Sequence, residues 1–310
     1  MTAWIASNIP SQRGRTAIVT GPGGLGFQTA LALARAGARV TLAGRNPEKG
    51  AAAVVKIRAA ADGADVRFEA LDLASFTSID AFAARWQDEC LDLLINNAGV
   101  MTPPARNATA DGFELQFGTN FLGHFALTAL LLPQLRRGRT ARVVTVTSFG
   151  ANFGKIDFDD LQSERNYSPM RAYNQSKLAD LLFAFELQRR SEANDWGIAS
   201  IAAHPGLALT ELIPNGAGRT SMISRLSRAI GPLVMQSPAQ GALSTLYAAT
   251  SPDARGGLYY GPSGPGGIRG GPVLTKPPVT AMDVGVSARL WERAERLTRV
   301  TFESSVQRAC

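Results

Sequence analysis

The sequence predicts an α/β fold built on a doubly wound parallel sheet of seven strands with helices on both faces. Short apolar, β-branched runs alternate with longer helical patterns along most of the 310 residues, which is typical of parallel βα units. A glycine-rich turn directly follows the first of these runs. Neither an internal repeat nor a linker between two composition regimes is visible, so we expect residues 1–310 to form a single domain.

The expected strands share a length of four to seven residues and a high content of Val, Ile, Leu and Ala. Turn residues or the start of a helical pattern bound them on each side. In chain order they cover residues 15–20, 39–43, 66–70, 91–96, 142–147, 198–203 and 257–260.

Helical periodicity fills most of the intervals between these strands. The sixth expected helix opens with Ser237 and Gln240, spaced as a capping box, and Pro238 occupies its first turn. Residues 207–236 have no clean period and are interpreted as a lid, and residues 256–310 as a Gly/Pro-rich segment that ends in a helix near 284–297. The expected helices before it cover residues 25–36, 47–61, 75–90, 109–136, 171–194 and 237–250.

Composition and charge exclude several classes of function. The net charge is +7, but the basic residues are scattered and form no stripe with interleaved aromatic residues, which argues against nucleic-acid binding. Two cysteines and two histidines without ligand spacing predict no metal site. Apolar runs are shorter than the roughly 20 residues of a membrane span, and the N-terminus lacks the pattern of a secretory signal, so we expect a cytoplasmic protein without a membrane span.

The turn after the first strand has the spacing of a dinucleotide-binding loop. Thr20 ends the strand, and the segment that follows matches G-x-G-x-x-G before an Ala/Leu-rich helix. Glycine permits positive φ, a close approach of pyrophosphate to the backbone, and tight packing of helix on strand. This context predicts a Rossmann-type sheet whose cofactor lies against Gly21, Gly23, Gly24, Leu25 and Gly26.

The end of the second strand indicates which nucleotide is bound. An NAD site would place a carboxylate there to accept bonds from the ribose 2′-hydroxyl, but this chain has Arg45 followed by Asn46. A guanidinium suits a 2′-phosphate, so NADP(H) is favoured and NAD(H) stays possible. Later strands end in further polar segments at the edge where such sheets bind ligands. These segments are Asp72-Leu73 and Asn97-Ala98-Gly99.

Tyr173 and Lys177 lie four residues apart at the start of an expected helix and therefore share one face. A free tyrosine, with a pKa near ~10, is a poor acid-base group at neutral pH, but a neighbouring ammonium stabilises its phenolate. Ser148 stands at the carboxyl end of the fifth strand, and Asn120 lies within the preceding helix. We expect these elements to converge, with Ser148 donating a hydrogen bond to a substrate oxygen.

Together these motifs resemble the short-chain dehydrogenase/reductase family, closest to its retinol-dehydrogenase-like group, which also resembles the protochlorophyllide reductases. The resemblance spans nearly the whole chain. It rests on TGPGGLG (20–26), LAGRN (42–46), LDL (71–73), NNAG (96–99), TNFLGHF (119–125), VTVTS (144–148), YNQSK (173–177), HPGLALT (204–210) and YYGPSG (259–264).

The resemblance implies a catalytic tetrad of Asn120, Ser148, Tyr173 and Lys177. Tyr173 would act as general acid or base, Ser148 would polarise the carbonyl, and Lys177 would assist Tyr173 and bind the nicotinamide ribose. Tyr173 and Lys177 would both contact the cofactor. Asn120 would hold a water that links Lys177 to solvent. The nicotinamide would lie by Pro205, Gly206 and Thr210, the adenosine ribose by Asn97 and Gly99, and the adenine by Asp72 and Leu73.

One departure from the family pattern concerns the glycine loop, which is one residue shorter than T-G-x-x-x-G-x-G and contains Pro22, a residue without a backbone donor. The family also implies self-association as a homodimer or homotetramer through the helices at 109–136 and 171–194. The shortened loop leaves open how the pyrophosphate is held.

The apolar residues of the lid at 207–236 predict an apolar small-molecule substrate. We therefore expect an NADP(H)-dependent oxidoreductase that interconverts an apolar ketone or aldehyde and its alcohol. Two alternatives stay open: a reductase of an activated C=C bond, and a non-catalytic NADP-binding sensor on the same fold.

Overall fold

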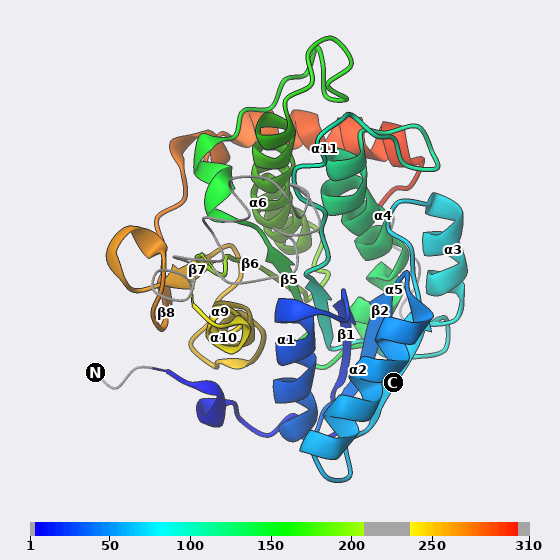
Figure 1. The fold of residues 1–310 in the computed structure, drawn as a ribbon, viewed down its shortest axis with the longest axis vertical. Helices are drawn as coiled ribbons and strands as arrows, with labels where there is room; N and C mark the ends of the chain where they lie inside the picture. Colours follow the sequence, from blue (N-terminus) through cyan, green and yellow to red (C-terminus); the bar gives the residue numbers. More distant parts are fainter. Residues whose placement is uncertain (1–3, 208–235, 303–310) are drawn as a thin grey trace.

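The computed structural model describes residues 4–207 and 236–302, and in this part of the chain one central sheet lies between two layers of helices (Figure 1). Its strand order is β3-β2-β1-β4-β5-β6-β7-β8. The strands are β1 (Thr16–Thr20), β2 (Arg39–Gly44), β3 (Val66–Ala70), β4 (Leu93–Asn96), β5 (Arg142–Val146), β6 (Ala199–Ala203), β7 (Tyr259–Pro262) and β8 (Pro272–Leu274).

The first seven strands are parallel, and each overlaps a run expected from the sequence. Strand β1 lies between β2 and β4, so the chain reverses its direction of travel across the sheet at this point. Such a switch point opens a crevice beyond the carboxyl ends of the strands. The glycine turn after β1 and the polar segments after β2, β3 and β4 all lie at this edge.

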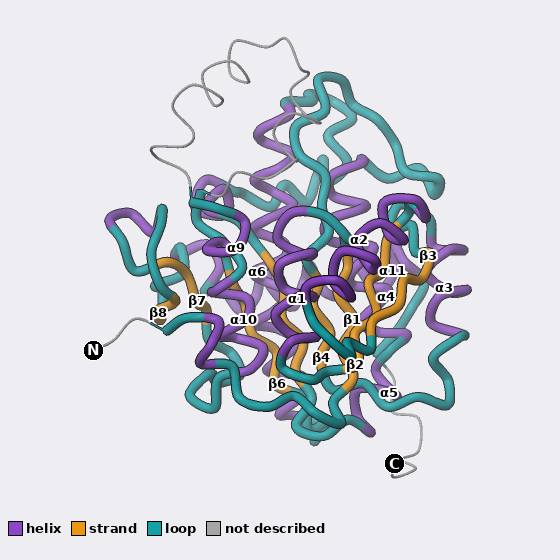
Figure 2. Tube along the Cα trace, turned by 60° about the horizontal axis from the view of Figure 1, so that its bottom comes forward, coloured by secondary structure: helices purple, strands orange, loops and turns teal. Residues whose placement is uncertain are grey.

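The prediction of seven strands was wrong by one, because β8 extends the sheet. It pairs antiparallel with β7, with Tyr260 opposite Leu274 and Pro262 opposite Pro272 (Figure 2). The segment between them is rich in glycine and proline, which favoured the interpretation of a loop. Gly266 and Gly267 adopt positive φ and reverse the chain, so these residues form the turn of a hairpin rather than a long loop.

Two hydrophobic clusters separate the helices into layers. The cluster on one face joins α3, α4, α6 and α11, and that on the other joins α1, α2 and α10 (Figure 1). The helices are α1 (Gly24–Arg35), α2 (Pro47–Ala60), α3 (Phe76–Ala84), α4 (Gly123–Leu130), α5 (Leu132–Arg137), α6 (Pro169–Ala193), α9 (Pro238–Gly241), α10 (Leu243–Thr250) and α11 (Val284–Thr298), with short turns η1 (Ala6–Asn8), η2 (Phe117–Leu122), η3 (Phe149–Phe153), η4 (Pro265–Gly267) and η5 (Val279–Ala281).

The expected helix at 109–136 was wrong in its first turns. Thr109 to Phe113 form a tight turn, in which Gly112 has φ +87° and the Thr109 and Phe113 backbones pair. Asp111-Gly112 is a turn signal that the helical pattern concealed. Helical structure begins at Leu115, continues through η2, a π-helical stretch, and is interrupted at Leu131, before Pro133. Asn120 thus lies in a π-helix, a local form that is frequent at functional sites.

Two other helices differ from expectation in their limits. The expected helix at 75–90 ends at Ala84, and that at 237–250 is divided at Ala242 into α9 and α10. The capping box of Ser237 and Gln240 is confirmed. The lid, apart from its two end residues, and Thr210 lie outside the described residues. No described helix combines the length and the apolar character that a bilayer span needs.

Candidate active site

The glycine turn after β1 is closely packed against its surroundings. Gly21 has φ +85°, and its N–H donates to Ala43 O at 2.7 Å, which ties the turn to the end of β2. A Cβ at Gly26 would lie 1.9 Å from Gly21 O and 2.7 Å from Asn97 Nδ2. Only glycine fits at that position, and its absence of a side chain allows α1 to pack directly on the turn.

The N-terminus of α1 has the donors that a pyrophosphate needs. Gly23 is the N-cap and supplies no side-chain hydrogen bond to the first turn. The first N–H groups of a helix have no partner within it, and the helix dipole adds partial positive charge there. Gly24, with φ +50°, begins the helix beside Leu25. The residues present therefore fit a dinucleotide phosphate at this helix end.

Pro22 explains how the shortened turn closes. A Cβ at Gly44 would lie 2.6 Å from Pro22 Cδ, so the proline ring rests on the last residue of β2. Proline lacks an N–H, but its fixed φ rigidifies the turn. The short loop is thus held by Pro22 on Gly44 at one point and by Gly21 on Ala43 at another.

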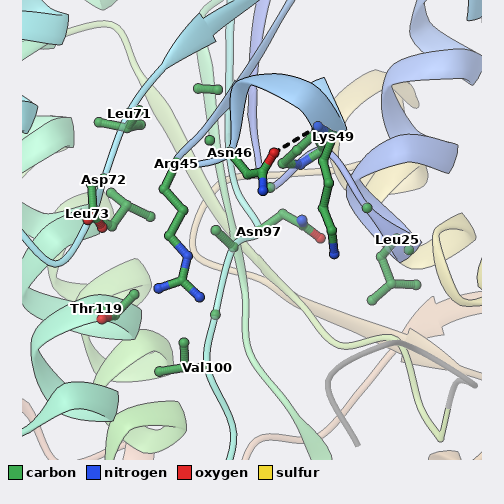
Figure 3. A pocket seen from close by; sticks show the side chains of 18 residues that line it. Leu25, Arg45, Asn46, Lys49, Leu71, Asp72, Leu73, Asn97, Val100 and Thr119 are labelled. Carbon is green, nitrogen blue, oxygen red and sulfur yellow. Dashed lines mark hydrogen bonds between the residues drawn. The ribbon is translucent and has the colours of Figure 1, made fainter. Parts of the chain in front are cut away.

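A cleft opens between this turn and the ends of β2, β3 and β4 (Figure 3). It contains most of the residues that the sequence predicts for the cofactor: Gly21, Gly23, Gly24, Leu25, Arg45, Asn46, Asp72, Leu73, Asn97, Ala98 and Gly99. Gly26 lies behind the turn as a packing residue. The cleft is completed by residues that were not predicted: Pro22, Ala43, Gly44, Lys49, Leu71, Val100 and Thr119.

Lys49 is the most informative of the residues that sequence reasoning missed. It lies in the first turn of α2, where its N–H donates to Asn46 Oδ1 at 2.8 Å. Figure 3 shows the Arg45 and Lys49 side chains extending in the same direction from the end of β2 and the start of α2. Asn46 is therefore the N-cap of α2. An N-cap accepts from the N–H three residues later, so the sequence could have placed Lys49 in the first helical turn, close to Arg45.

The loop after β4 is held by the hydroxyl of Thr20, which is fully buried. Thr20 Oγ1 accepts from the N–H groups of Asn97 and Ala98, each at 2.9 Å. Asn97 Nδ2 donates to Thr20 O at 2.7 Å. The side chain of Asn97 therefore fastens β4 to the glycine turn.

His124 connects this nucleotide end to the helix that carries Asn120. Its Nδ1 lies 2.7 Å from Asn120 O, and its Nε2 lies 2.9 Å from Thr20 Oγ1. A carbonyl oxygen only accepts, so Nδ1 carries the proton and Nε2 accepts from Thr20. Burial lowers the pKa of His124 to about 3, although its hydrogen bond to Asn120 opposes this. The ring is therefore neutral at neutral pH, and its role is to join the two hydrogen-bond partners.

Replacing His124 with Gln should reduce the loss of stability in mild acid. Below pH ~6.5 the histidine binds a proton in the unfolded chain but not in the folded protein. His124 therefore lowers the unfolding free energy as the pH falls. From pH 7 to 5 its contribution is about 2 kcal/mol. Urea unfolding of both proteins at these two pH values measures it. The raised pKa of Asp180 favours the folded state in acid and so acts in the opposite direction, but it does so equally in the wild type and in His124→Gln. If the unfolding free energies of the two proteins depend on pH to the same extent, His124 does not stay neutral in the folded protein.

Asn120 is fully buried behind Gly99 and Val100, two residues that line the cleft. Its Oδ1 accepts from Val100 N at 2.7 Å, and its Nδ2 donates to Val100 O at 3.0 Å and to Ser176 Oγ at 2.9 Å. This side chain therefore joins η2 to the loop after β4 and to α6. A Cβ at Gly99 would lie 3.2 Å from Asn120 Oδ1 and 3.7 Å from Lys177 Nζ, so both side chains lie next to this lining residue of the cleft.

Ser148 and Tyr173 both lie next to Gly150, at the start of η3. Ser148 follows β5, caps η3 and accepts from Gly150 N at 3.2 Å. A Cβ at Gly150 would lie 3.3 Å from Tyr173 Cε1, which places the aromatic ring directly against this turn. Within the described part of the chain, neither the Ser148 proton nor the Tyr173 hydroxyl has a hydrogen-bond partner. Both hydroxyls are therefore available to a substrate oxygen.

Lys177 is buried one turn beyond Tyr173 on α6. Its Nζ donates to Val146 O at 3.1 Å and to Asp180 Oδ2 at 2.9 Å, and Thr147 Oγ1 donates to its backbone O at 2.6 Å. Burial by itself lowers the pKa of Lys177, but the charges of Asp180 and Tyr173 outweigh it and the pKa is raised. Lys177 is thus charged at neutral pH beside Tyr173.

Pro205 and Gly206 follow β6, the strand next to the one that ends near Ser148. Gly206 has φ +66°, and a Cβ there would lie 2.2 Å from Ile268 O. Gln236 Nε2 donates to Pro205 O. His204 is buried, which lowers its pKa to about 4, and its ring lies against Tyr259. These contacts anchor the start and end of the lid segment at the carboxyl edge of the sheet.

Comparisons with known proteins find similar sequences and a similar structure. The family model described as short chain dehydrogenase matches residues 15–217. Mouse polyprenol dehydrogenase is 42% identical over 299 residues, covering 94% of this chain and 85% of that protein. Human retinol dehydrogenase 13 is 42% identical over 293 residues, covering 92% and 84%. A crystal structure of an uncharacterised protein from Mycobacterium paratuberculosis is 40% identical, with a TM-score of 0.81 and coverage of 98% and 100%.

Proposed function

This chain belongs to the short-chain dehydrogenase family, in its retinol-dehydrogenase-like group, and we propose that it is an NADP(H)-dependent oxidoreductase that interconverts an apolar ketone or aldehyde and its alcohol. The observation that carries the proposal is the position of Gly99. This residue lines the cleft and lies next to Asn120 and Lys177, two of the four residues of the expected tetrad. The cleft offers an uncapped helix N-terminus and two cations. Beyond its lining residue Gly99 lies the buried ammonium of Lys177, one helical turn from the unpartnered hydroxyl of Tyr173.

Each residue of the expected tetrad has a separate role in the proposed reaction. A bound nicotinamide nucleotide would supply or accept the hydride. Tyr173 donates a proton to the carbonyl oxygen in reduction and removes it from the alcohol in oxidation, while Ser148 donates a hydrogen bond to the same oxygen. Lys177 favours the phenolate by its charge. Asn120 holds the loop of Gly99 and Val100 against α6, which fixes the cleft relative to Tyr173 and Lys177.

An apolar substrate is supported by the surface next to Ser148. Phe149 and Phe153 lie in η3 with ring centroids 5.6 Å apart, and Phe153 is 69% exposed. Met170, three residues before Tyr173 in the first turn of α6, is 49% exposed. The relatives named polyprenol and retinol dehydrogenases carry names of apolar alcohols, which supports the same class of substrate.

The direct test is a substrate panel with the purified protein. Apolar aldehydes and ketones are offered with NADPH, the matching alcohols with NADP⁺, and conjugated enones as a separate set. Turnover of the carbonyl set, followed by nucleotide absorbance, is the expected result. Reduction confined to the C=C bonds of the enones, or nucleotide binding without any turnover, would replace the proposal by one of the two alternatives.

Replacing Arg45 with Ala should weaken NADPH binding by about 10- to 100-fold and leave NADH binding unchanged. A charge-assisted hydrogen bond is worth roughly 1.5–3 kcal/mol, and about 1.4 kcal/mol is tenfold in affinity. Fluorescence titration with both nucleotides measures the effect. Arg35→Ala is the matched control, since Arg35 lies at the far end of α1 and donates to Ala60 O. Equal losses for both nucleotides would refute 2′-phosphate recognition.

We also propose that the protein self-associates as a homodimer or homotetramer. The structure limits which part of α6 is exposed for that contact. Trp291 of α11 packs on Phe183 of α6 with ring centroids 5.8 Å apart, and Phe302 joins the same cluster. The chain's own C-terminal helix thus covers part of α6, one of the helices expected to form the contact. Sedimentation equilibrium of the full chain determines the state.

A further inference from the structure

Asp180 is a buried carboxylate next to the proposed proton-transfer group. It lies on α6, three residues after Lys177, and is 1% exposed. Its Oδ2 is 2.9 Å from Lys177 Nζ, and its Oδ1 has no hydrogen-bond donor among the described residues. Lys177 is therefore the only described group that compensates the charge of this carboxylate.

The surroundings supply no other charge close to the pair. The turns η2, η3 and η5 and strand β6 contain no ionisable side chain, and α4 contributes only His124, which is neutral. Arg142 lies at the opposite end of β5 and donates to Ala248 O and Ser251 O. The charged residues of α11 meet α6 farther along, where Arg190 lies over Trp291. Asp180, Lys177 and Tyr173 thus form an isolated electrostatic unit.

The ammonium of Lys177 has three protons, and the structure accounts for two of them. One goes to Asp180 Oδ2 and one to Val146 O, at 2.9 and 3.1 Å. The third is left for the side of Tyr173 and Gly99. Burial raises the pKa of Asp180 to about 6, with Lys177 acting in the opposite direction, so the carboxylate is charged at neutral pH. Its charge offsets the ammonium that would otherwise act on Tyr173 alone.

We propose that Asp180 is a positioning residue for the proton transfer: its carboxylate fixes Lys177 beside Tyr173 and offsets the ammonium charge, and it thereby sets the pH range in which Tyr173 ionises. The inference rests on the proposed role of Tyr173 as the acid-base group. Removal of the carboxylate charge leaves Tyr173 and Lys177 with a net positive charge in a buried site. Loss of the first proton from that pair then becomes easier.

The test is the variant Asp180→Asn, whose amide oxygen can still accept from Lys177. Ultraviolet absorbance of the phenolate is followed against pH in the nucleotide-free protein, and the signal of the same protein carrying Tyr173→Phe is subtracted. We expect the midpoint of Tyr173 ionisation to move to lower pH than in the wild type. The acidic limb of alcohol oxidation, measured as kcat/KM, should move in the same direction.

Two further variants make the outcome specific. Glu186→Gln removes another buried carboxylate of α6, one that pairs with Arg189 and Arg190, and should leave the midpoint unchanged. Asp180→Glu keeps the charge and should keep the wild-type midpoint even if kcat falls. Asp180→Ser repeats the test if the amide prevents folding.

An unchanged midpoint in Asp180→Asn, or an equal shift in Glu186→Gln, would overturn the inference, because Asp180 would then act only in packing. An inactive wild-type protein on every substrate would instead defeat the proposed function, while the absorbance titration would still report on the Asp180 charge.

Discussion

Tyr173→Phe is expected to lower kcat for carbonyl reduction and alcohol oxidation by about 10²–10⁴-fold, the usual contribution of a positioned general acid or base. The ring remains in place against Gly150, so the change removes one oxygen and little packing. Tyr173 does not line the described cleft, and nucleotide affinity should therefore stay close to that of the wild type. Steady-state kinetics and NADPH titration of the same preparation separate the two effects.

Tyr167→Phe is the matched control for this prediction. Its hydroxyl donates to Pro103 O at 2.8 Å, and burial raises its pKa to about 12, so it is unsuited to proton transfer near neutral pH. Its loss should change kcat by far less. A similar loss of kcat in both variants would show that a tyrosine hydroxyl in this region matters for structure, and Tyr173 would lose its assigned role.

The sequence predicted best where one local signal determines the structure. The turn from Gly21 to Gly26 is an example, because glycine is needed there for a positive φ, for close packing of the helix on the turn and for the start of α1. The structure shows a positive φ at Gly21 and Gly24 and the close packing at Gly26. The parallel strands were also predictable, because strands covered on both faces need continuous apolar runs. Arg45, Asp72 and Asn97 then reach one cleft, since carboxyl ends of parallel strands share an edge.

The residues that sequence reasoning missed acquire their meaning from tertiary contacts. His124 has an ordinary helical position in the sequence, and only the fold places its ring between Asn120 O and Thr20 Oγ1. Asp180 is one acidic residue on a long helix, where an exposed position is the usual expectation. Its burial against Lys177 follows from how α6 packs on β5 and β6, which no local pattern encodes.

The errors in secondary structure have a related cause, the competition between local signals. Asp111-Gly112 lay within a stretch of helical periodicity, and the turn prevailed because Gly112 takes φ +87° and Thr109 closes the chain on Phe113. Strand β8 was missed because glycine and proline surround it. Tetrad positions could be inferred from motif spacing, but their hydrogen bonds, such as Asn120 with Ser176, could not.

Gly26→Ala is expected to weaken NADPH binding by at least about tenfold and to lower the unfolding free energy by roughly 1–3 kcal/mol, the usual cost of overpacking. The added Cβ would lie 1.9 Å from Gly21 O, a backbone atom whose own residue is tied to Ala43. The turn must therefore shift, and the α1 amides and Asn97 shift with it. Urea unfolding and NADPH titration measure the two losses.

Gly285→Ala provides the comparison, because Gly285 lies in helix α11 and its added Cβ would meet only the Asp283 carboxylate, at 3.3 Å. Alanine favours a helix over glycine by ~1 kcal/mol, so this variant should be as stable as the wild type or more stable. Wild-type affinity in Gly26→Ala would mean that the turn relaxes without cost and that the phosphates are held elsewhere. Loss of affinity only in Gly26→Ala would instead locate the pyrophosphate at the turn, where Pro22 and Gly21 already fix the backbone against β2.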